Sequence, residues 1–192
     1  ESTGRALGLD VRTIITDGSQ PVGRGIGPAL EARDVLQVLQ DDGHAPQDLR
    51  DKSLLLAAHL LEMGGKAEVG HGLALAQSTL ISGQAWEKFR AICMAQGGLK
   101  TIESADFSHC VRATSGGVVA YINNRFIARL ASLAGAPNAP TAGMDMHVRL
   151  GDDINQGDPL FTLYAEAPGE LAYALDFLDG HTDVIRIERE MV

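Results

Sequence analysis

Cysteine, lysine and long apolar runs are all scarce in this 192-residue chain, and each scarcity excludes some classes of protein. The two cysteines, Cys93 and Cys110, form neither a disulfide framework nor a CxxC motif, so we expect two reduced thiols. No apolar run approaches the roughly 20 residues needed to span a bilayer. The sequence also shows no basic-then-apolar leader. We therefore expect a cytoplasmic protein with no membrane partner.

Positive charge is also limited. The formal net charge is −9 at pH 7 and the sequence pI is about 5.0, which argues against nucleic acid as the main partner. An anionic ligand such as phosphate would need a local basic site or a helix terminus.

The beginning of the chain indicates a piece of a longer protein. It opens at Glu1 without a methionine, and residues 2–9 resemble the last turns of a helix. A short strand is expected at residues 11–16. A turn-rich stretch and a glycine run at residues 23–28 follow, and Pro28 suits the first position of a helix.

Helical periodicity dominates up to about residue 98, and we place a domain boundary there. The expected helices cover residues 28–40, 47–63, 72–81 and 84–95. The helix at 47–63 is apolar nearly all round, which is typical of a helix that packs on several sides or lacks a neighbour.

Signals for β structure dominate from residue 99 to residue 192. A hairpin is expected between residues 110–113 and 117–122, and residues 144–150 alternate between apolar and polar side chains as in a half-buried strand. The remaining expected elements are strands at 160–164 and 184–188 and helices at 123–134 and 168–178.

A Gly23-x-Gly25 pair between a strand and a helix is close to a dinucleotide-binding loop, in which glycines let a pyrophosphate approach a helix N-terminus. Pro28 occupies the place of the third glycine, and the loop is too long for the tight turn of that fold. We favour a tight backbone turn over nucleotide binding.

Other catalytic or metal motifs are weak. The six histidines are scattered without spaced ligand partners, and His147 lies on the polar face of its strand, where a solvated side chain is the simpler interpretation. Ser19 near Asp17 has neither a GxSxG elbow nor a paired histidine. Taken for chemistry alone, the residues predict no active site.

Two glycine–aspartate turns, Gly151-Asp152 and Gly157-Asp158, enclose a short loop between strands. This resembles the corner of biotinyl and lipoyl carrier domains, which would make the chain a non-catalytic binding or assembly module. A carrier needs a lysine for attachment. The four lysines, however, are Lys52, Lys66, Lys88 and Lys100, and none lies after residue 100.

Three blocks together resemble the thymidine phosphorylase and AMP phosphorylase family. Residues 16–34 are similar to the family stretch Gln-Pro-Leu-Gly-x-x-x-Gly-Asn-Ala-Leu-Glu-Val, and residues 116–123 and 142–161 supply the second and third blocks. The order and spacing match over essentially the whole chain. Gly27-Pro28 in place of Gly-Asn favours the longer branch, which includes archaeal AMP phosphorylases and bacterial type 2 thymidine phosphorylases.

The resemblance implies an α+β chain in two parts. Residues 1–98 would be the helical remainder of an α/β phosphorylase catalytic domain, and residues 99–192 a C-terminal hammerhead-like barrel-sandwich domain. The implied activity is reversible phosphorolysis of a pyrimidine nucleoside, with phosphate as co-substrate and no required cofactor; AMP is the alternative substrate. A homodimer is the expected assembly.

Family catalysis depends on a Lys-x-Ser-Thr-Gly-Gly-type phosphate loop and an Ala-Ser-Ile-x-Ser-Lys-Lys-type helix, and neither sequence occurs in these residues. The resemblance therefore implies catalytic residues upstream of Glu1 and an inactive fragment. Some members bind potassium through two backbone carbonyls and a carboxylate, which correspond to Val22, Gly25 and Asp34. The family carboxylate is a glutamate, so Asp34 as an ordinary exposed helix residue is the alternative interpretation.

Overall fold

The computed structural model describes residues 1–188 as a mixed α+β fold. Within that range there are seven helices and two antiparallel sheets. The helices are α1 (Ser2–Ala6), α2 (Pro28–Leu39), α3 (Gln47–Met63), α4 (Gly72–Ile81), α5 (Gln84–Ala95), α6 (Asn124–Leu133) and α7 (Pro168–Asp179). The strands are β1 (Gly25–Ile26), β2 (Phe107–Arg112), β3 (Gly117–Ile122), β4 (Gly143–Met146), β5 (Asp153–Ile154), β6 (Pro159–Ala165) and β7 (Ile185–Glu188).

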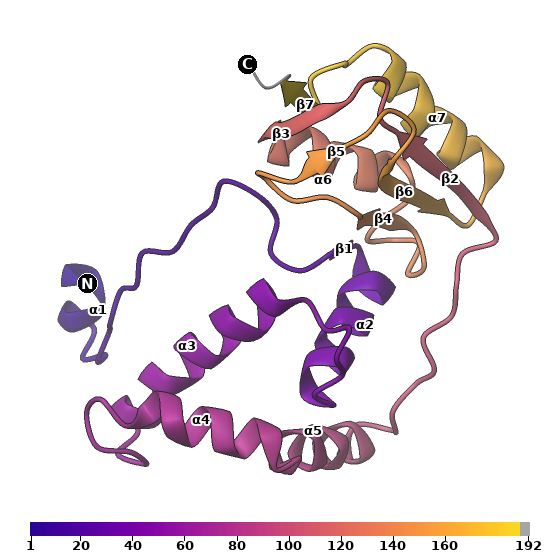
Figure 1. The fold of residues 1–192 in the computed structure, drawn as a ribbon. Helices are drawn as coiled ribbons and strands as arrows, with labels where there is room; N and C mark the ends of the chain where they lie inside the picture. The colour runs from indigo at the N-terminus through magenta and orange to yellow at the C-terminus, as the bar shows by residue number, and fades with distance from the viewer. Residues whose placement is uncertain (189–192) are drawn as a thin grey trace.

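Helices α2 to α5 form one half of the molecule, which an extended segment after α5 connects to the β-rich half (Figure 1). The small core of this half consists of Val38, Leu54, Ala76 and Leu80 with their apolar neighbours. Helix α3 has the predicted bounds, and its Leu60 remains 68% exposed. A groove of about 410 Å³ between α2, α3, α4 and the start of α5 is lined mainly by apolar side chains.

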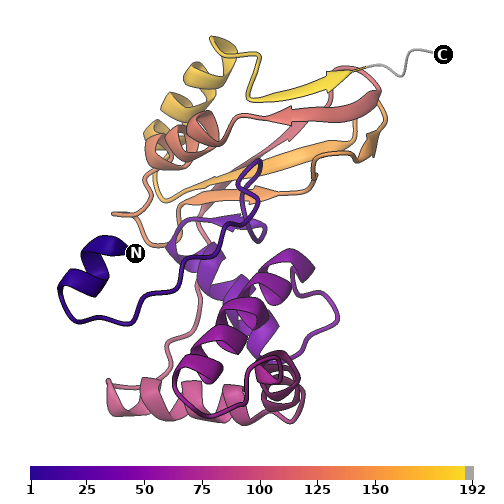
Figure 2. The ribbon, with the colours of Figure 1, turned by 90° about the vertical axis from the view of Figure 1, so that its left-hand side faces the viewer.

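The β-rich half contains both sheets, as Figure 2 shows from the side. One sheet has the strand order β1-β4-β6-β2, and the other has the order β5-β3-β7. Strand β1 comes from the glycine run near the start of the chain, and it pairs with β4 through Gly25–Asp145 and Ile26–Met144. A strand from the first 98 residues therefore completes a sheet in the second half.

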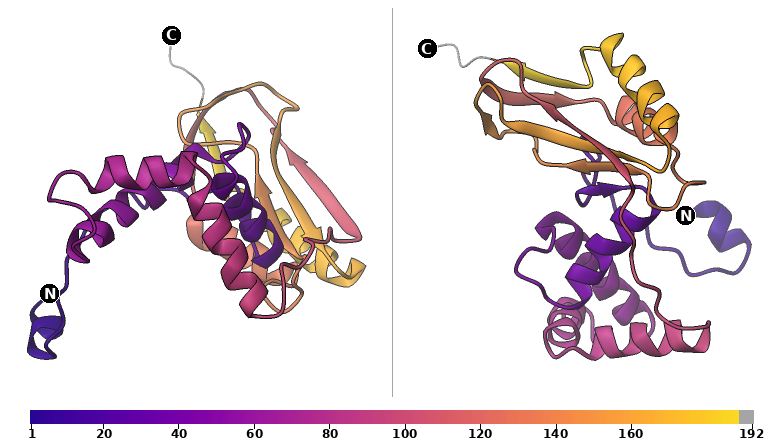
Figure 3. Two further views of the ribbon diagram at one scale, coloured as in Figure 1. Left: turned by 90° about the horizontal axis from the view of Figure 1, so that it is seen from below. Right: turned by 90° about the vertical axis from the view of Figure 1, so that its right-hand side faces the viewer.

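Helices α6 and α7 lie side by side at one end of the sheets (Figure 3). They enclose the main core with both sheets. Its largest fully buried apolar side chains are Val119, Ile122, Ile127, Leu130, Met144, Met146, Phe161 and Leu163. The Asn123 side chain accepts a hydrogen bond from the Phe126 N–H and so caps the start of α6.

Three predicted strand features are wrong. Residues 11–16 form no strand in the described structure, because no other segment pairs with them there. Strands β2 and β3 do not form a hairpin, since β2 pairs with β6 and β3 pairs with β5 and β7. Buried and less buried side chains alternate from residue 144 to residue 148, but the strand itself ends at Met146. None of the described helices is long and apolar enough to cross a membrane.

Candidate functional site

The glycine loop, which we define as residues 21–27, lies where the helical half meets the β-rich half (Figure 1). Its end is closely packed against the segment before β4. Gly143 has φ +148°, and a Cβ there would overlap the carbonyl oxygen of Ile26. Gly27 has φ +124° and approaches the Ala142 carbonyl in the same way. Two backbones can approach this closely because both residues lack a side chain.

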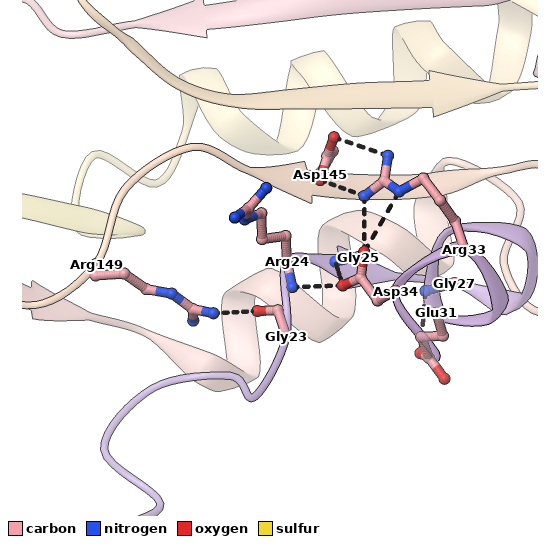
Figure 4. A network of polar contacts seen from close by, with 9 residues as sticks. All are labelled: Gly23, Arg24, Gly25, Gly27, Glu31, Arg33, Asp34, Asp145 and Arg149. Carbon is pink, nitrogen blue, oxygen red and sulfur yellow. Dashed lines mark hydrogen bonds and ion pairs between the residues drawn. The ribbon is translucent and has the colours of Figure 1, made fainter. Parts of the chain in front are cut away.

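Asp34 of α2 is buried beneath the glycine loop, with only 1% of its surface exposed. Its Oδ2 accepts hydrogen bonds from the backbone N–H groups of Arg24 and Gly25, at 2.6 and 2.8 Å (Figure 4). The interpretation of Asp34 as an ordinary exposed residue is wrong. The same bonds occupy two N–H groups that a bound phosphate would use, so the carboxylate stabilises the turn from inside the protein.

Arg33 joins this carboxylate to the β-rich half. Its Nη1 and Nη2 donate to the two carboxylate oxygens of Asp145 on β4, at 3.0 and 2.8 Å, and Nη2 lies 3.1 Å from Oδ1 of Asp34. The hydrogen bonds to Asp145 are the main reason that the pKa of Arg33 rises above its ordinary value, and burial partly opposes the rise. A guanidinium held by two carboxylates stays charged at every pH relevant to a folded protein.

A second arginine holds the start of the glycine loop. Arg149, which follows β4, donates to the carbonyl oxygen of Pro21 at 2.7 Å and to that of Gly23. It also lies 2.8 Å from Oδ2 of Asp48 on α3, and the same Oδ2 accepts the Gly23 N–H at 3.1 Å. The loop is thus fixed to both halves of the protein by charged side chains.

Sequence reasoning identified Asp34 but missed Arg33, Asp48, Asp145 and Arg149. The one available signal was the alternation at residues 144–150, which placed Asp145 and Arg149 on the same polar face. Their partners are more than 100 residues away in the sequence, as in the Arg33–Asp145 pair. Spacing within one segment could not reveal them.

The other candidate residues are not brought together. His147 is exposed, as predicted, and its Nε2 lies 2.8 Å from Oγ1 of Thr162. Ser19 donates to the Asp17 carboxylate, and the backbone N–H of Ser19 is the main cause of a lowered pKa at Asp17. Within residues 1–188, no three His, Cys, Asp or Glu side chains are grouped as metal ligands.

Two of the three predicted potassium residues, Gly25 and Asp34, are in direct contact through the hydrogen bond described above. Val22 lies three residues before Gly25 in the loop and is 36% exposed. The potassium site stays a prediction. What the geometry defines is a mixed α+β scaffold in which charged side chains fasten a glycine loop between two halves.

Comparison with known proteins identifies this scaffold. Residues 118–183 match the pyrimidine nucleoside phosphorylase C-terminal domain. The chain is 58% identical over 190 residues to a "Putative thymidine phosphorylase" of Hahella chejuensis, covering 98% of this chain and 37% of that protein. It is 55% identical over 191 residues to "Putative thymidine phosphorylase 2" of an Acidovorax species, covering 100% and 37%.

A third relative, from Legionella pneumophila strain Corby, has the same name as the first and is 51% identical over 185 residues. The chain therefore belongs to the thymidine phosphorylase family and contains its C-terminal domain. It spans about 37% of the length of the curated relatives it matches.

Proposed function

We propose that this chain is the C-terminal part of a pyrimidine nucleoside phosphorylase of the thymidine type. The whole enzyme would cleave a nucleoside with phosphate to give a free base and (deoxy)ribose 1-phosphate, reversibly. The observation that carries this proposal is the match over nearly the whole chain to relatives named for thymidine phosphorolysis, at 50–58% identity.

In this proposal the 192 residues have a structural role and hold the catalytic part of the enzyme in place. Phosphorolysis depends on positioned charges around phosphate and sugar, and the phosphate-loop and Ser-Lys sequences of the family do not occur among these residues. The helical half would be the end of the α/β catalytic domain, and the β-rich half the hammerhead-like barrel sandwich. The glycine loop would fix the orientation of one half against the other.

The proposal is tested first on the chain alone. We expect no phosphate-dependent release of base from thymidine, uridine or AMP, because the catalytic groups are not in this sequence. The release of base is followed by chromatography against a buffer blank. Release that requires phosphate and increases with the amount of chain would contradict the assignment of this part as support.

The second test uses a longer polypeptide that includes this chain and extends upstream to the length of the relatives. We expect phosphate-dependent release of thymine from thymidine at a higher kcat/KM than release of adenine from AMP. A preference for AMP would replace the thymidine assignment with the AMP alternative. Failure to act on any of these substrates with phosphate would contradict phosphorolysis altogether.

We also propose a homodimer. The apolar groove between α2, α3, α4 and α5 and the exposed Leu60 leave apolar surface uncovered, and contiguous exposed apolar surface is typical of interaction sites. A two-fold dimer is the most common way to cover such a surface.

A further inference from the structure

The charged atoms around the glycine loop are already paired with one another. Oδ2 of Asp34 accepts two backbone N–H groups, and its Oδ1 faces the guanidinium of Arg33 at 3.1 Å. The carbonyl oxygens of Pro21 and Gly23 accept hydrogen bonds from Arg149. Guanidinium N–H groups therefore face one carboxylate oxygen of Asp34 and the carbonyl oxygens of Pro21 and Gly23, on either side of Val22.

This arrangement does not fit a potassium ion at Val22, Gly25 and Asp34. A hard cation needs the free lone pairs of carbonyl and carboxylate oxygens. Here the carboxylate oxygens of Asp34 are directed at N–H donors, and one of those donors belongs to a positively charged side chain. A potassium ion placed beside Asp34 would have to displace Gly25 N–H or approach Arg33 against charge repulsion.

We propose that Arg33 and Arg149 are the permanent cations of the glycine loop, so that the order of the loop is independent of monovalent metal ions. Arg33 pairs with the carboxylates of Asp34 on α2 and Asp145 on β4, and Arg149 binds the loop carbonyls and the Asp48 carboxylate. The planar guanidinium suits both tasks, because it donates several N–H groups in fixed directions and never loses its proton.

The charges at the loop are consistent with this assignment. Arg33 faces two carboxylates, those of Asp34 and Asp145, which leaves one negative charge in excess. Oδ2 of Asp34 also accepts two backbone N–H groups, whose partial positive charges stabilise an anion.

The first test measures cation dependence in the unaltered 192-residue chain, and it is independent of phosphorolysis. The midpoint of thermal unfolding is recorded in potassium, sodium and choline chloride at one ionic strength, and thallium(I), a potassium mimic, is titrated by calorimetry. We expect equal midpoints and no saturable heat of binding. A midpoint raised by potassium above both sodium and choline, or saturable thallium binding, would overturn the proposal.

The second test removes the internal cation. Arg33→Met keeps an aliphatic stem and leaves two carboxylates unpaired, so its midpoint should fall on the order of 10 °C in all three salts. Arg24→Met is the matched control, because the Arg24 guanidinium makes no hydrogen bond or ion pair within residues 1–188. The control should stay within about 2 °C of the unaltered chain.

If the unfolding midpoints of Arg33→Met and Arg24→Met fall equally, any positive charge near the loop has the same effect. That result would contradict a specific role for Arg33. Should Arg33→Met not fold, Arg33→Lys provides the same comparison. Lysine keeps the charge but loses the two parallel hydrogen bonds to Asp145, so the unfolding midpoint of Arg33→Lys should fall further than that of Arg24→Met. A midpoint for Arg33→Lys equal to that of the control would also overturn the proposal.

Discussion

Removal of the Asp34 carboxylate is the most direct test of how the glycine loop is held. Asp34→Ala deletes the acceptor of the Arg24 and Gly25 N–H groups and one of the two carboxylates that Arg33 contacts. A buried donor left without an acceptor costs about 1–3 kcal/mol. Two such donors and one lost ionic contact that Asp145 partly replaces give a total loss of about 3–5 kcal/mol.

In a chain of this size, each 1 kcal/mol lowers the unfolding midpoint by roughly 2–4 °C. Asp34→Ala should therefore unfold about 6–20 °C below the unaltered chain when thermal unfolding is followed by circular dichroism. Asp34→Asn keeps one acceptor oxygen for the N–H groups but presents an amide to Arg33, so its loss should be smaller, at about 1–2 kcal/mol.

Asp176→Ala is the control for the loss of one negative charge, because Asp176 is exposed on α7 and its side chain makes no hydrogen bond or ion pair within the described range. Its midpoint should be unchanged within about 1 °C. If Asp34→Ala also unfolds within about 1 °C of the unaltered chain, the carboxylate does not hold the loop and the reasoning fails.

Three further results are expected. Gly143→Ala should destabilise the chain by about 1–3 kcal/mol in denaturant unfolding, because the added Cβ would overlap the Ile26 carbonyl. Gly169→Ala is the control and should not destabilise the chain, because a Cβ there meets nothing within 4 Å. Equal effects of the two substitutions would contradict the close approach of the backbones at Gly143. The backbone N–H groups of Gly72 and Gly70 are the main reason that the pKa of Glu62 lies below its ordinary value of 4.5. The stability that the Glu62 carboxylate gives to the folded chain is therefore present above pH 4.5 and is lost as the pH falls through the lower folded pKa. An NMR-detected pKa for Glu62 at or above 4.5 would refute this assignment. The unaltered chain should be dimeric by light scattering and Leu60→Lys more monomeric, and a strictly monomeric unaltered chain at the highest concentration would exclude dimerisation through α3.

Local signals allowed the helices to be predicted well. Pro28 at the first turn of α2 and the Gly64-Gly65 pair after α3 mark ends that depend only on nearby residues, and α3, α4 and α5 have the predicted bounds. The resemblance to the thymidine phosphorylase family is also confirmed.

Strand pairing was predicted poorly because it depends on distant partners. Residues 107–112 and 117–122 are separated by a short turn that favours a hairpin, yet their hydrogen-bond partners are β6 for the first and β5 and β7 for the second. The two-residue strand Gly25–Ile26 has no alternation of its own, and its register comes from β4. The same separation in sequence concealed the pairing of Arg33 with Asp145 and of Arg149 with Asp48. The boundary at residue 98 stays a prediction.

The pairing of β1 with β4 limits how this protein can be divided. A shortened chain that began at residue 99 would contain every other strand of its sheet but would lack the segment that covers the outer edge of β4. The backbone N–H of Met146 would then lose its acceptor, the carbonyl of Arg24, and Asp145 would lose its arginine. An open edge of this kind invites pairing with other chains. The β-rich half therefore contains its own core, but the edge strand of one of its sheets comes from the glycine loop. A version made without that loop would need another segment to pair with β4.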